Sequence, residues 1–225
     1  IVRHKEILTK NKIIIYSDNE EDANAVARRF EKSGYEDVSI YADFQYEWLT
    51  DPNLPMQKLE RFQHLVPAKW VNQLLNGEKP LHCENDNFVV VHAHYRNRDA
   101  YLSGHIPEAI DINTNDLESE ETWNRRSPEE LKETLEAHGI TSDTTVIMYG
   151  KYMHPKNEDP FPGSAAGDIG AIRCAFIMMY AGVKDVRLLN GGFQSWQDAG
   201  FEISYEDEPK MPVKDFGAKI PQHPD

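Results

Sequence analysis

The chain has 225 residues, which is enough for one large domain or for a domain and a half. Apolar residues make up 40% and charged residues 28%, as in ordinary globular proteins. Acidic residues outnumber basic ones by 38 to 24, so the formal net charge of −14 argues against a general nucleic-acid or anionic-membrane surface. No apolar run approaches the length of a spanning helix, and two cysteines are too few for a disulfide scaffold or a cysteine-rich zinc site.

The first sixty residues carry a strand–helix–strand pattern. The run KIIIY at residues 12–16 predicts a buried strand, and residues 38–41 predict a second one. Between them, four apolar residues at helical spacing come before Gly34, which is placed to end a helix. These four residues are Ala23, Val26, Ala27 and Phe30. Residues 50–65 are polar and interrupted by proline, which predicts a connection between domains.

The remainder of the chain alternates predicted helices and strands. The clearest helix signal is SPEE at residues 127–130, where Ser127 can cap the helix and Glu130 can complete a capping box. A long polar loop before residue 170 leads into another apolar helix, which Gly182 would end. Strands are predicted at 88–91, 110–112, 146–149 and 186–189, and further helices at 69–75, 99–103 and from 171 onward.

A strand–loop–helix–glycine–strand–tryptophan unit occurs twice. When Gly34 is placed over Gly182, the matched pairs are Ala23 and Ala171, Ala27 and Ala175, Asp37 and Asp185, Val38 and Val186, and Trp48 and Trp196. Two unrelated strand–helix–strand units are the alternative, but the matched positions favour a repeat. Further strand and helix patterns precede the second copy from residue 65 onward. The first copy has only a short stretch before it, so we expect the back half of one α/β domain followed by a whole second one.

Three stretches between residues 65 and 204 resemble the rhodanese-like sulfurtransferases. Residues 101–109 read YLSGHIPEA, residues 146–149 read VIMY, and residues 182–196 read GVKDVRLLNGGFQSW. They are similar to an early Y-x-x-G-H-I-P-x-A motif, to the strand that delivers the active-site loop, and to a closing G-V-x-D-V-x-x-L-x-G-G-x-x-x-W segment. The details are closest to bacterial proteins with three rhodanese domains. The motif positions in this sequence are Gly104, His105, Pro107, Gly191, Gly192 and Trp196.

The resemblance implies an α/β fold with a central, mostly parallel sheet and helices on both faces. Residues 1–60 would hold the C-terminal half of a first, non-catalytic rhodanese-like domain and a connection. Residues 61–206 would form a complete second, non-catalytic domain, and residues 207–225 a linker toward a third one. In the related proteins the third domain carries the reactive cysteine, and this chain is expected to stop where that domain would begin.

The same resemblance places the sulfur-accepting cysteine directly after the central strand, where backbone N–H groups and a helix N-terminus stabilise a thiolate. That position is Ser17 in the first copy and Gly150 in the second, and neither side chain can carry a persulfide. The first loop, SDNEED, would repel thiosulfate through its carboxylates. The second loop, residues 150–170, is too long for a tight cradle and is either a partner-binding excursion or a tolerated insertion. With no nucleophile beside it, His105 is expected to hold its turn by hydrogen bonds to the backbone.

The remaining reactive side chains favour structural roles. Cys174 falls on an apolar helix face and Cys83 has acidic neighbours, so neither is expected to be an active thiolate. His92 and His94 alternate on a strand and lie near His82 in sequence, so a metal site is conceivable. Polar histidines at strand ends are far more common, however, and the spacing matches no metal motif. We therefore expect no metal and no cofactor.

The leading interpretation is a non-catalytic portion of a multidomain thiosulfate sulfurtransferase. By resemblance, the parent protein moves sulfane sulfur from thiosulfate or a mercaptan to a thiophilic acceptor through a cysteine persulfide on a domain outside this chain. The alternative is a catalytically dead rhodanese module that binds other proteins. The expected partners are the C-terminal catalytic domain and a small-molecule sulfur donor, with no nucleic acid and no membrane span. Family usage suggests the periplasm, although no leader sequence precedes Ile1.

Overall fold

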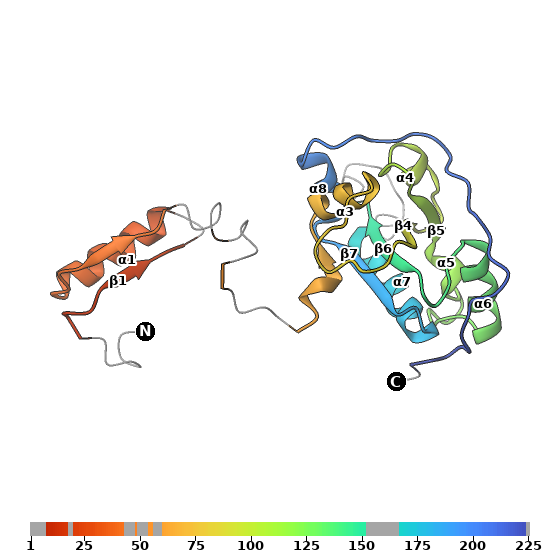
Figure 1. Ribbon diagram of the computed structural model, residues 1–225, viewed down its shortest axis with the longest axis horizontal. Coiled ribbons are helices and arrows are strands. Elements are labelled where there is room, and N and C mark those ends of the chain that lie inside the picture. Colours follow the sequence, from red (N-terminus) through yellow and green to blue (C-terminus); the bar gives the residue numbers. More distant parts are fainter. Residues whose placement is uncertain are drawn as a thin grey trace. The chain divides into compact units, whose positions relative to one another are not determined.

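A computed structural model of the chain describes residues 8–17, 20–42, 48, 54–55, 60–151 and 167–223 (Figure 1). The side chain of Asp168 also lies outside the described part. The chain divides into two compact units, Ile1–Leu59 and Glu60–Asp225, here called unit 1 and unit 2. The division falls within the connection that the sequence predicts at residues 50–65. Among the described residues, no helix has both the length and the apolar character needed to cross a bilayer.

The described residues of unit 1 include a strand–helix–strand element. Strands β1 (Ile13–Ile15) and β2 (Val38–Ile40) pair in parallel, and helix α1 (Glu20–Lys32) connects them. The first turn of α1 is acidic and its last turn is basic. These charges interact favourably with the helix dipole and stabilise the helix. Gly34 follows with a φ of +88°, a conformation that glycine adopts without strain. Among the described residues of unit 1, Ile15, Ala23 and Ala27 form a buried apolar cluster.

Unit 2 is built on a five-stranded sheet in the order β3-β7-β6-β4-β5, with every pairing parallel. Its strands are β3 (Leu65–Val66), β4 (Phe88–His94), β5 (Ile110–Asn113), β6 (Thr145–Gly150) and β7 (Asp185–Leu189). The 3-10 helix η1 (Phe62–His64) comes before β3. The α-helices among its described residues are α3 (Ala68–Leu75), α4 (Asp99–Leu102), α5 (Thr114–Leu117), α6 (Pro128–Ala137), α7 (Gly167–Ala181) and α8 (Gly192–Asp198).

Helices cover both faces of the sheet, as Figure 1 shows. Successive side chains of a strand point to opposite faces, so the fully buried strand β6 contributes to two cores. Val146 and Met148 pack with residues of α5, α6 and α7. Ile147 and Tyr149 pack with residues of α3 and α8. The predicted fold class, an α/β protein with a parallel sheet between helices, is confirmed.

Helix α6 begins as its sequence predicts. The Ser127 hydroxyl accepts a hydrogen bond from the Glu130 N–H over 3.3 Å, and the Glu130 carboxylate accepts one from the Ser127 N–H over 3.0 Å. Leu131 and Leu135 are fully buried on the inner side of the helix. Gly139 then ends the helix with a φ of +73°. A capping box, a buried stripe and a terminal glycine therefore place this helix over the sheet.

The β1–α1–β2 and β6–α7–β7 elements share the same strand register. Ile13 is paired with Val38 in unit 1, and Val146 is paired with Val186 in unit 2. The helices also end alike. The N–H of the residue after Gly34 or Gly182 donates to the carbonyl five residues earlier, over 3.2 Å in unit 1 and 3.0 Å in unit 2. The paired strand residues and the hydrogen-bonded residues at the helix ends occupy equivalent positions when the two copies are aligned in sequence.

The C-terminal segment differs from the linker that the sequence predicts over residues 207–225. Its described part, residues 207–223, packs along unit 2. Phe216 is fully buried in the core with α5, α6 and α7, and Ile220 joins the same cluster. The Phe216 carbonyl accepts a hydrogen bond from Ser142 N–H over 2.7 Å, and the Val213 N–H donates to the Glu136 carbonyl over 2.9 Å. The proline and lysine content suggested a linker, but these two apolar side chains anchor the segment.

Candidate functional site

The position expected to hold a cysteine lies at the carboxyl end of β6. Gly150 is the last residue of that strand and is buried. In parallel α/β sheets, ligands bind at the edge where the carboxyl ends of the strands meet. Lys151 follows Gly150, and the next described residue is Gly167, where α7 begins. The predicted excursion at residues 150–170 therefore lies mostly outside the described residues.

The ammonium group of Lys151 binds three oxygen atoms of the α4 region. Its Nζ donates to the Ala100 carbonyl over 3.1 Å, to Ser103 Oγ over 2.9 Å and to the Gly104 carbonyl over 3.2 Å. It also lies 5.1 Å from the centre of the Phe193 ring. Burial lowers the pKa of Lys151. The side chain after Gly150 therefore links the end of β6 to the turn that follows α4.

His92, in the middle of the site, is a fully buried imidazole. Its ring lies 4.9 Å from that of Tyr149 and 5.8 Å from that of Tyr101, measured between ring centres. Neither ring nitrogen has a hydrogen-bond partner among the described residues. Burial lowers the pKa of His92 to about 3, with a smaller contribution from nearby His94, so the imidazole is neutral at neutral pH. Burial also raises the pKa of Tyr149, whose hydroxyl accepts a hydrogen bond from Ile106 N–H over 3.1 Å.

The G-H-I-P turn lies beside this cluster. The His105 ring stacks on that of Tyr101 with 3.9 Å between ring centres, and its Nδ1 lies 3.1 Å from the Tyr101 carbonyl oxygen. The backbone of His105 exchanges two hydrogen bonds of 2.9 Å with Ser204. Gly104 has a φ of +122°, and a Cβ there would lie 3.0 Å from Ile203 Cγ2. The turn continues through buried Ile106 to half-buried Pro107.

The G-G-x-x-x-W segment forms the start and the core-facing side of α8. Gly191 precedes the helix with a φ of +79°, and Gly192 begins it with a φ of +54°. The Trp196 indole N–H donates to the Glu202 carbonyl over 2.7 Å, and the ring is buried against Phe201. The same helix supplies Phe193, whose ring stacks on the Tyr149 ring and lies next to the ammonium group of Lys151. This motif therefore reaches the candidate site through Phe193.

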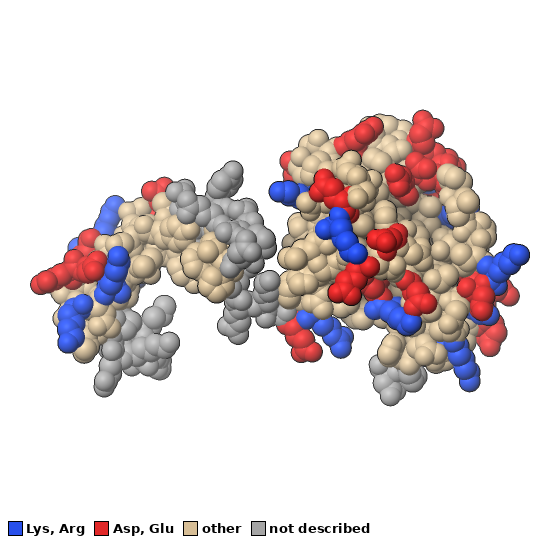
Figure 2. All heavy atoms as spheres, in the orientation of Figure 1, with Lys and Arg blue, Asp and Glu red and all other residues tan. Residues whose placement is uncertain are grey.

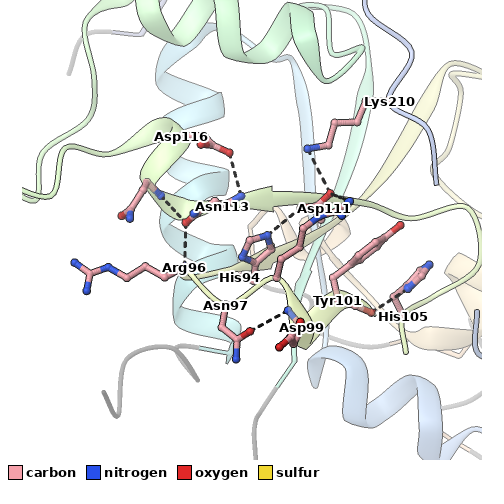
Figure 3. Close-up of polar contacts among 12 residues, drawn as sticks. His94, Arg96, Asn97, Asp99, Tyr101, His105, Asp111, Asn113, Asp116 and Lys210 are labelled. Carbon is pink, nitrogen blue, oxygen red and sulfur yellow. Dashed lines mark hydrogen bonds and ion pairs between the residues drawn. The ribbon is translucent and has the colours of Figure 1, made fainter. Parts of the chain in front are cut away.

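A second polar network centres on Asp111, in the middle of β5 (Figure 3). Its carboxylate accepts from His94 Nε2 over 3.0 Å and from the Arg98 guanidinium over 3.1 and 3.2 Å, and lies 3.3 Å from Lys210 Nζ. Burial opposes ionisation of Asp111, but the hydrogen bonds from His94 and Arg98 and the charge of Lys210 outweigh it. The pKa of Asp111 is therefore held well below its usual range. Arg98 also binds Asp207, so the network ties the C-terminal segment to the sheet.

Neither cysteine lies at the carboxyl end of β6, where the reactive thiol is expected in unit 2. Cys174 is fully buried inside α7, and Cys83 is 4% exposed between α3 and β4. Burial raises the pKa of both thiols, although the charge of Arg187 partly offsets this effect at Cys83. Ser17 follows β1 in unit 1 and is half-buried; residues 18–19 beside it lie outside the described part.

The described residues contain no group of three histidine, cysteine, aspartate or glutamate side chains arranged to hold a metal ion. His94 binds Asp111, whereas His82 contacts the ring of Phe62 with 5.5 Å between ring centres. Sequence reasoning considered His92 and His94 together but missed Lys151, Phe193 and Asp111. Two signals were available: Lys151 directly follows Gly150, and Asp111 interrupts an apolar strand between Ile110 and Ile112.

Comparisons with known proteins agree with this architecture. The chain is 38% identical over 224 residues to "Thiosulfate sulfurtransferase YnjE" of Escherichia coli (strain K12), a match that covers 99% of this chain and 47% of that protein. It is 32% identical over 143 residues to "Sulfur carrier protein TtuD" of Thermus thermophilus, a match that covers 63% of this chain and 42% of that protein.

Among solved structures, EanB in complex with hercynine matches with 59% identity and a TM-score of 0.77, covering 99% of this chain and 52% of that one. Another EanB structure, with 59% identity and a TM-score of 0.76, contains ergothioneine and a cysteine persulfide. The chain thus spans about half the length of these relatives. Residues 68–199 match the family described as "Rhodanese-like domain", and the chain belongs to this family.

Proposed function

We propose that this chain is a non-catalytic part of a larger sulfurtransferase whose reactive cysteine lies on a further domain. The observation that carries the proposal is the glycine at the end of β6. Gly150 has no side chain to accept sulfur, and the next residue, Lys151, binds neutral oxygens. Both cysteines are buried elsewhere with raised pKa values, and a thiol in that state is a poor nucleophile.

In the proposed reaction, a thiolate of the parent protein attacks the outer sulfur of thiosulfate. A new S–S bond forms, the S–S bond of thiosulfate breaks, and sulfite leaves with the electron pair. A nucleophilic acceptor then attacks the terminal sulfur of the persulfide, the persulfide S–S bond breaks and the thiolate leaves with its electron pair. With cyanide no proton is lost, whereas with hercynine the new C–S bond replaces an imidazole C–H bond and the proton passes to solvent. The relatives named as thiosulfate sulfurtransferases support thiosulfate as the donor. The 59% identity to EanB makes hercynine the first acceptor to test, and ergothioneine the product to look for.

The matched strand register of the two units supports a tandem arrangement in the parent protein. In this proposal, unit 1 is the back half of a first rhodanese-like domain and unit 2 is a second one. Neither unit takes part in the covalent steps. Both units provide surfaces against which other domains of the parent protein pack. Location in the periplasm stays a prediction, which fractionation of the source cells would test.

The test compares sulfur transfer by this chain and by the full-length parent protein. With thiosulfate as donor and cyanide or hercynine as acceptor, we expect turnover by the parent and none above background by the chain. Mass spectrometry after treatment with thiosulfate should find no persulfide on Cys83 or Cys174. Cys83→Ser and Cys174→Ala in the parent should leave turnover unchanged. The proposal would be overturned if the chain alone showed turnover and if Cys83→Ser or Cys174→Ala, made in that chain, abolished it.

The alternative, a dead rhodanese module that binds proteins through the loop at residues 150–170, depends on residues 152–166, which lie outside the described part. If the parent protein shows no persulfide and no turnover with any donor, this alternative becomes the stronger one. Deletion of the loop would then be expected to abolish capture of the partner protein.

A further inference from the structure

Helix α7 is apolar on two opposite sides. Its inner side packs on the sheet through buried residues that include Ala171, Cys174 and Met178. On its outer side, Ile169 is 66%, Ile172 is 36% and Phe176 is 66% exposed. These three residues, here called the outer stripe, follow the i, i+3, i+7 spacing of one helix face. A helix that is apolar all round is typical of one buried on both sides, so something is expected to cover this stripe.

The outer stripe borders a groove of about 790 Å³ that carries a concentration of positive charge. Phe176 belongs to both the stripe and the groove wall, beside Met179 and Tyr180. The wall contains the basic residues Arg61, Arg125, Arg173 and Lys184, the histidines His64 and His223, and a single carboxylate, Glu118. Arg173 pairs with that acid over 2.7 Å, and Lys184 pairs with Asp143, so Arg61 and Arg125 are the cations of the wall that the proposal assigns to a partner.

The basic groove contrasts with the rest of the molecule. The whole chain carries a formal charge of −14, and Figure 2 shows acidic side chains spread over the upper part of unit 2 in that view. The guanidinium of Arg125 lies over the Tyr180 ring, with 4.1 Å between Arg125 Cζ and the ring centre. Cations presented on an apolar, aromatic wall suit a partner surface that combines apolar side chains with carboxylates.

The described end of the chain reaches this groove. The N–H groups of Gln222 and His223 both lie 3.2 Å from the carbonyl oxygen of Tyr180, in the last turn of α7. His223 itself lines the groove. Polypeptide that continues beyond Asp225 in a longer protein would therefore start at the groove wall. A short tether gives a following domain a high effective concentration at the groove.

We propose that the outer stripe and the groove form the docking surface for the domain that follows Asp225 in the parent protein. This proposal rests on the proposed function, which assigns the reactive cysteine to such a domain. The docking face of that domain would present apolar side chains to Ile169, Ile172 and Phe176 and carboxylates to Arg61 and Arg125. It would pack against the outer side of α7, with the groove as the anchoring point near the tether.

The test uses the full-length parent protein and measures the rate of protease cleavage in the segment after Asp225. Phe176→Glu places a charge in the outer stripe, and Arg125→Glu reverses a charge in the groove. Each is expected to raise the cleavage rate about tenfold, the factor that corresponds to the loss of one interface anchor. Met211→Glu is the matched control, since Met211 is 74% exposed and does not line the groove. It should leave the cleavage rate unchanged.

Unchanged cleavage in both Phe176→Glu and Arg125→Glu would overturn the docking proposal. Self-association of the full-length parent protein, measured by sedimentation and abolished by Phe176→Glu, would also overturn it, because a second copy would then cover the stripe. The two proposals fail separately. If neither variant changes the cleavage rate and the parent protein still forms a persulfide, only the docking surface is rejected. Absence of any persulfide in the parent rejects the proposed function, whatever the cleavage rates.

Discussion

The Nζ of Lys151 lies 3.2 Å from the carbonyl oxygen of Gly104, so the residue after β6 is bonded to the G-H-I-P turn. This contact joins two features that lie far apart in the sequence: the end of the central strand and the early family motif. Lys151 completes its bonding with the Ala100 carbonyl and Ser103 Oγ. The polar bonds at the carboxyl edge of β6 therefore serve to hold the protein together.

Replacing Lys151 should reveal this structural role. Lys151→Met keeps the aliphatic stem but leaves the Ala100 and Gly104 carbonyls without this donor. We expect the free energy of unfolding to fall by about 1–3 kcal/mol, the usual cost of unsatisfied buried polar groups. Ser103→Ala removes one acceptor of Lys151 and the 3.3 Å hydrogen bond from Ser103 Oγ to the Ala100 carbonyl, but it keeps the ammonium group and should cost clearly less. Urea unfolding of the two variants measures the difference, and equal losses would contradict the assigned role of the ammonium group.

His92 should make the chain sensitive to acid. Its pKa is about 3 in the folded protein and has the ordinary value of 6.5 once unfolding exposes the ring. Between these values the unfolded state binds a proton that the folded state does not. The free energy of unfolding should therefore fall by roughly 1.4 kcal/mol for each pH unit below about 6.5, until the pH approaches about 3.

His92→Phe removes this titration while keeping an aromatic ring beside Tyr101 and Tyr149. Unfolding by urea should be followed for both proteins between about pH 7 and about pH 4, where His92 exchanges its proton on unfolding. His105 and His138, whose pKa values burial also lowers, are present in both proteins, so their contributions cancel in the difference. Parallel stability curves for the wild type and the variant would show that His92 keeps its ordinary pKa.

Local sequence signals were sufficient for most of the fold. The capping box at Ser127 and Glu130 placed α6, and apolar β-branched runs placed the inner strands. The linker predicted for residues 207–225 leaves out the packing of this segment, because proline and lysine content describes only average polarity. Its position is set by two separated apolar side chains, Phe216 and Ile220, which find their pockets only after the sheet and helices have assembled.

The candidate site was less accessible from the sequence than the fold. The resemblance directed attention to Gly150 and His105, but the cluster is completed by side chains from other elements. Lys151 bonds to the Ala100 carbonyl of α4, and Phe193, at the start of α8, places its ring next to the ammonium group of Lys151. Such contacts depend on how parallel strands bring distant loops to one edge of a sheet, and spacing along the chain does not encode them.

Asp111 is expected to be the stability-determining member of its network. Asp111→Asn removes the negative charge that binds His94, Arg98 and Lys210, and should cost roughly 3 kcal/mol, as when a buried ion pair loses one partner. The matched control is Asp207→Asn, because Asp207 binds the same Arg98 from an exposed position. Its effect on stability should be much smaller. Urea unfolding decides between them, and comparable losses would mean that burial of the Asp111 carboxylate does not matter.

Alanine substitutions at Gly139 and Gly77 distinguish the energetic cost of disturbing the C-terminal segment from the cost of backbone strain. Both follow helices with a φ of +73°, so alanine should cost each about 1 kcal/mol through the left-handed backbone. A Cβ at Gly77 meets nothing within 4 Å, whereas a Cβ at Gly139 would lie 2.6 Å from the Met211 carbonyl oxygen. Because a backbone atom cannot rotate away, Gly139→Ala must displace the segment around Met211.

We therefore expect Gly139→Ala to lower the free energy of unfolding more than Gly77→Ala. It should also speed hydrogen exchange at the Val213 and Phe216 amides, which are bonded to Glu136. Exchange at these amides should stay unchanged in Gly77→Ala, because that substitution strains only its own turn. Equal stability losses with unchanged exchange in both variants would mean that residues 207–223 do not pack against the end of α6 in solution.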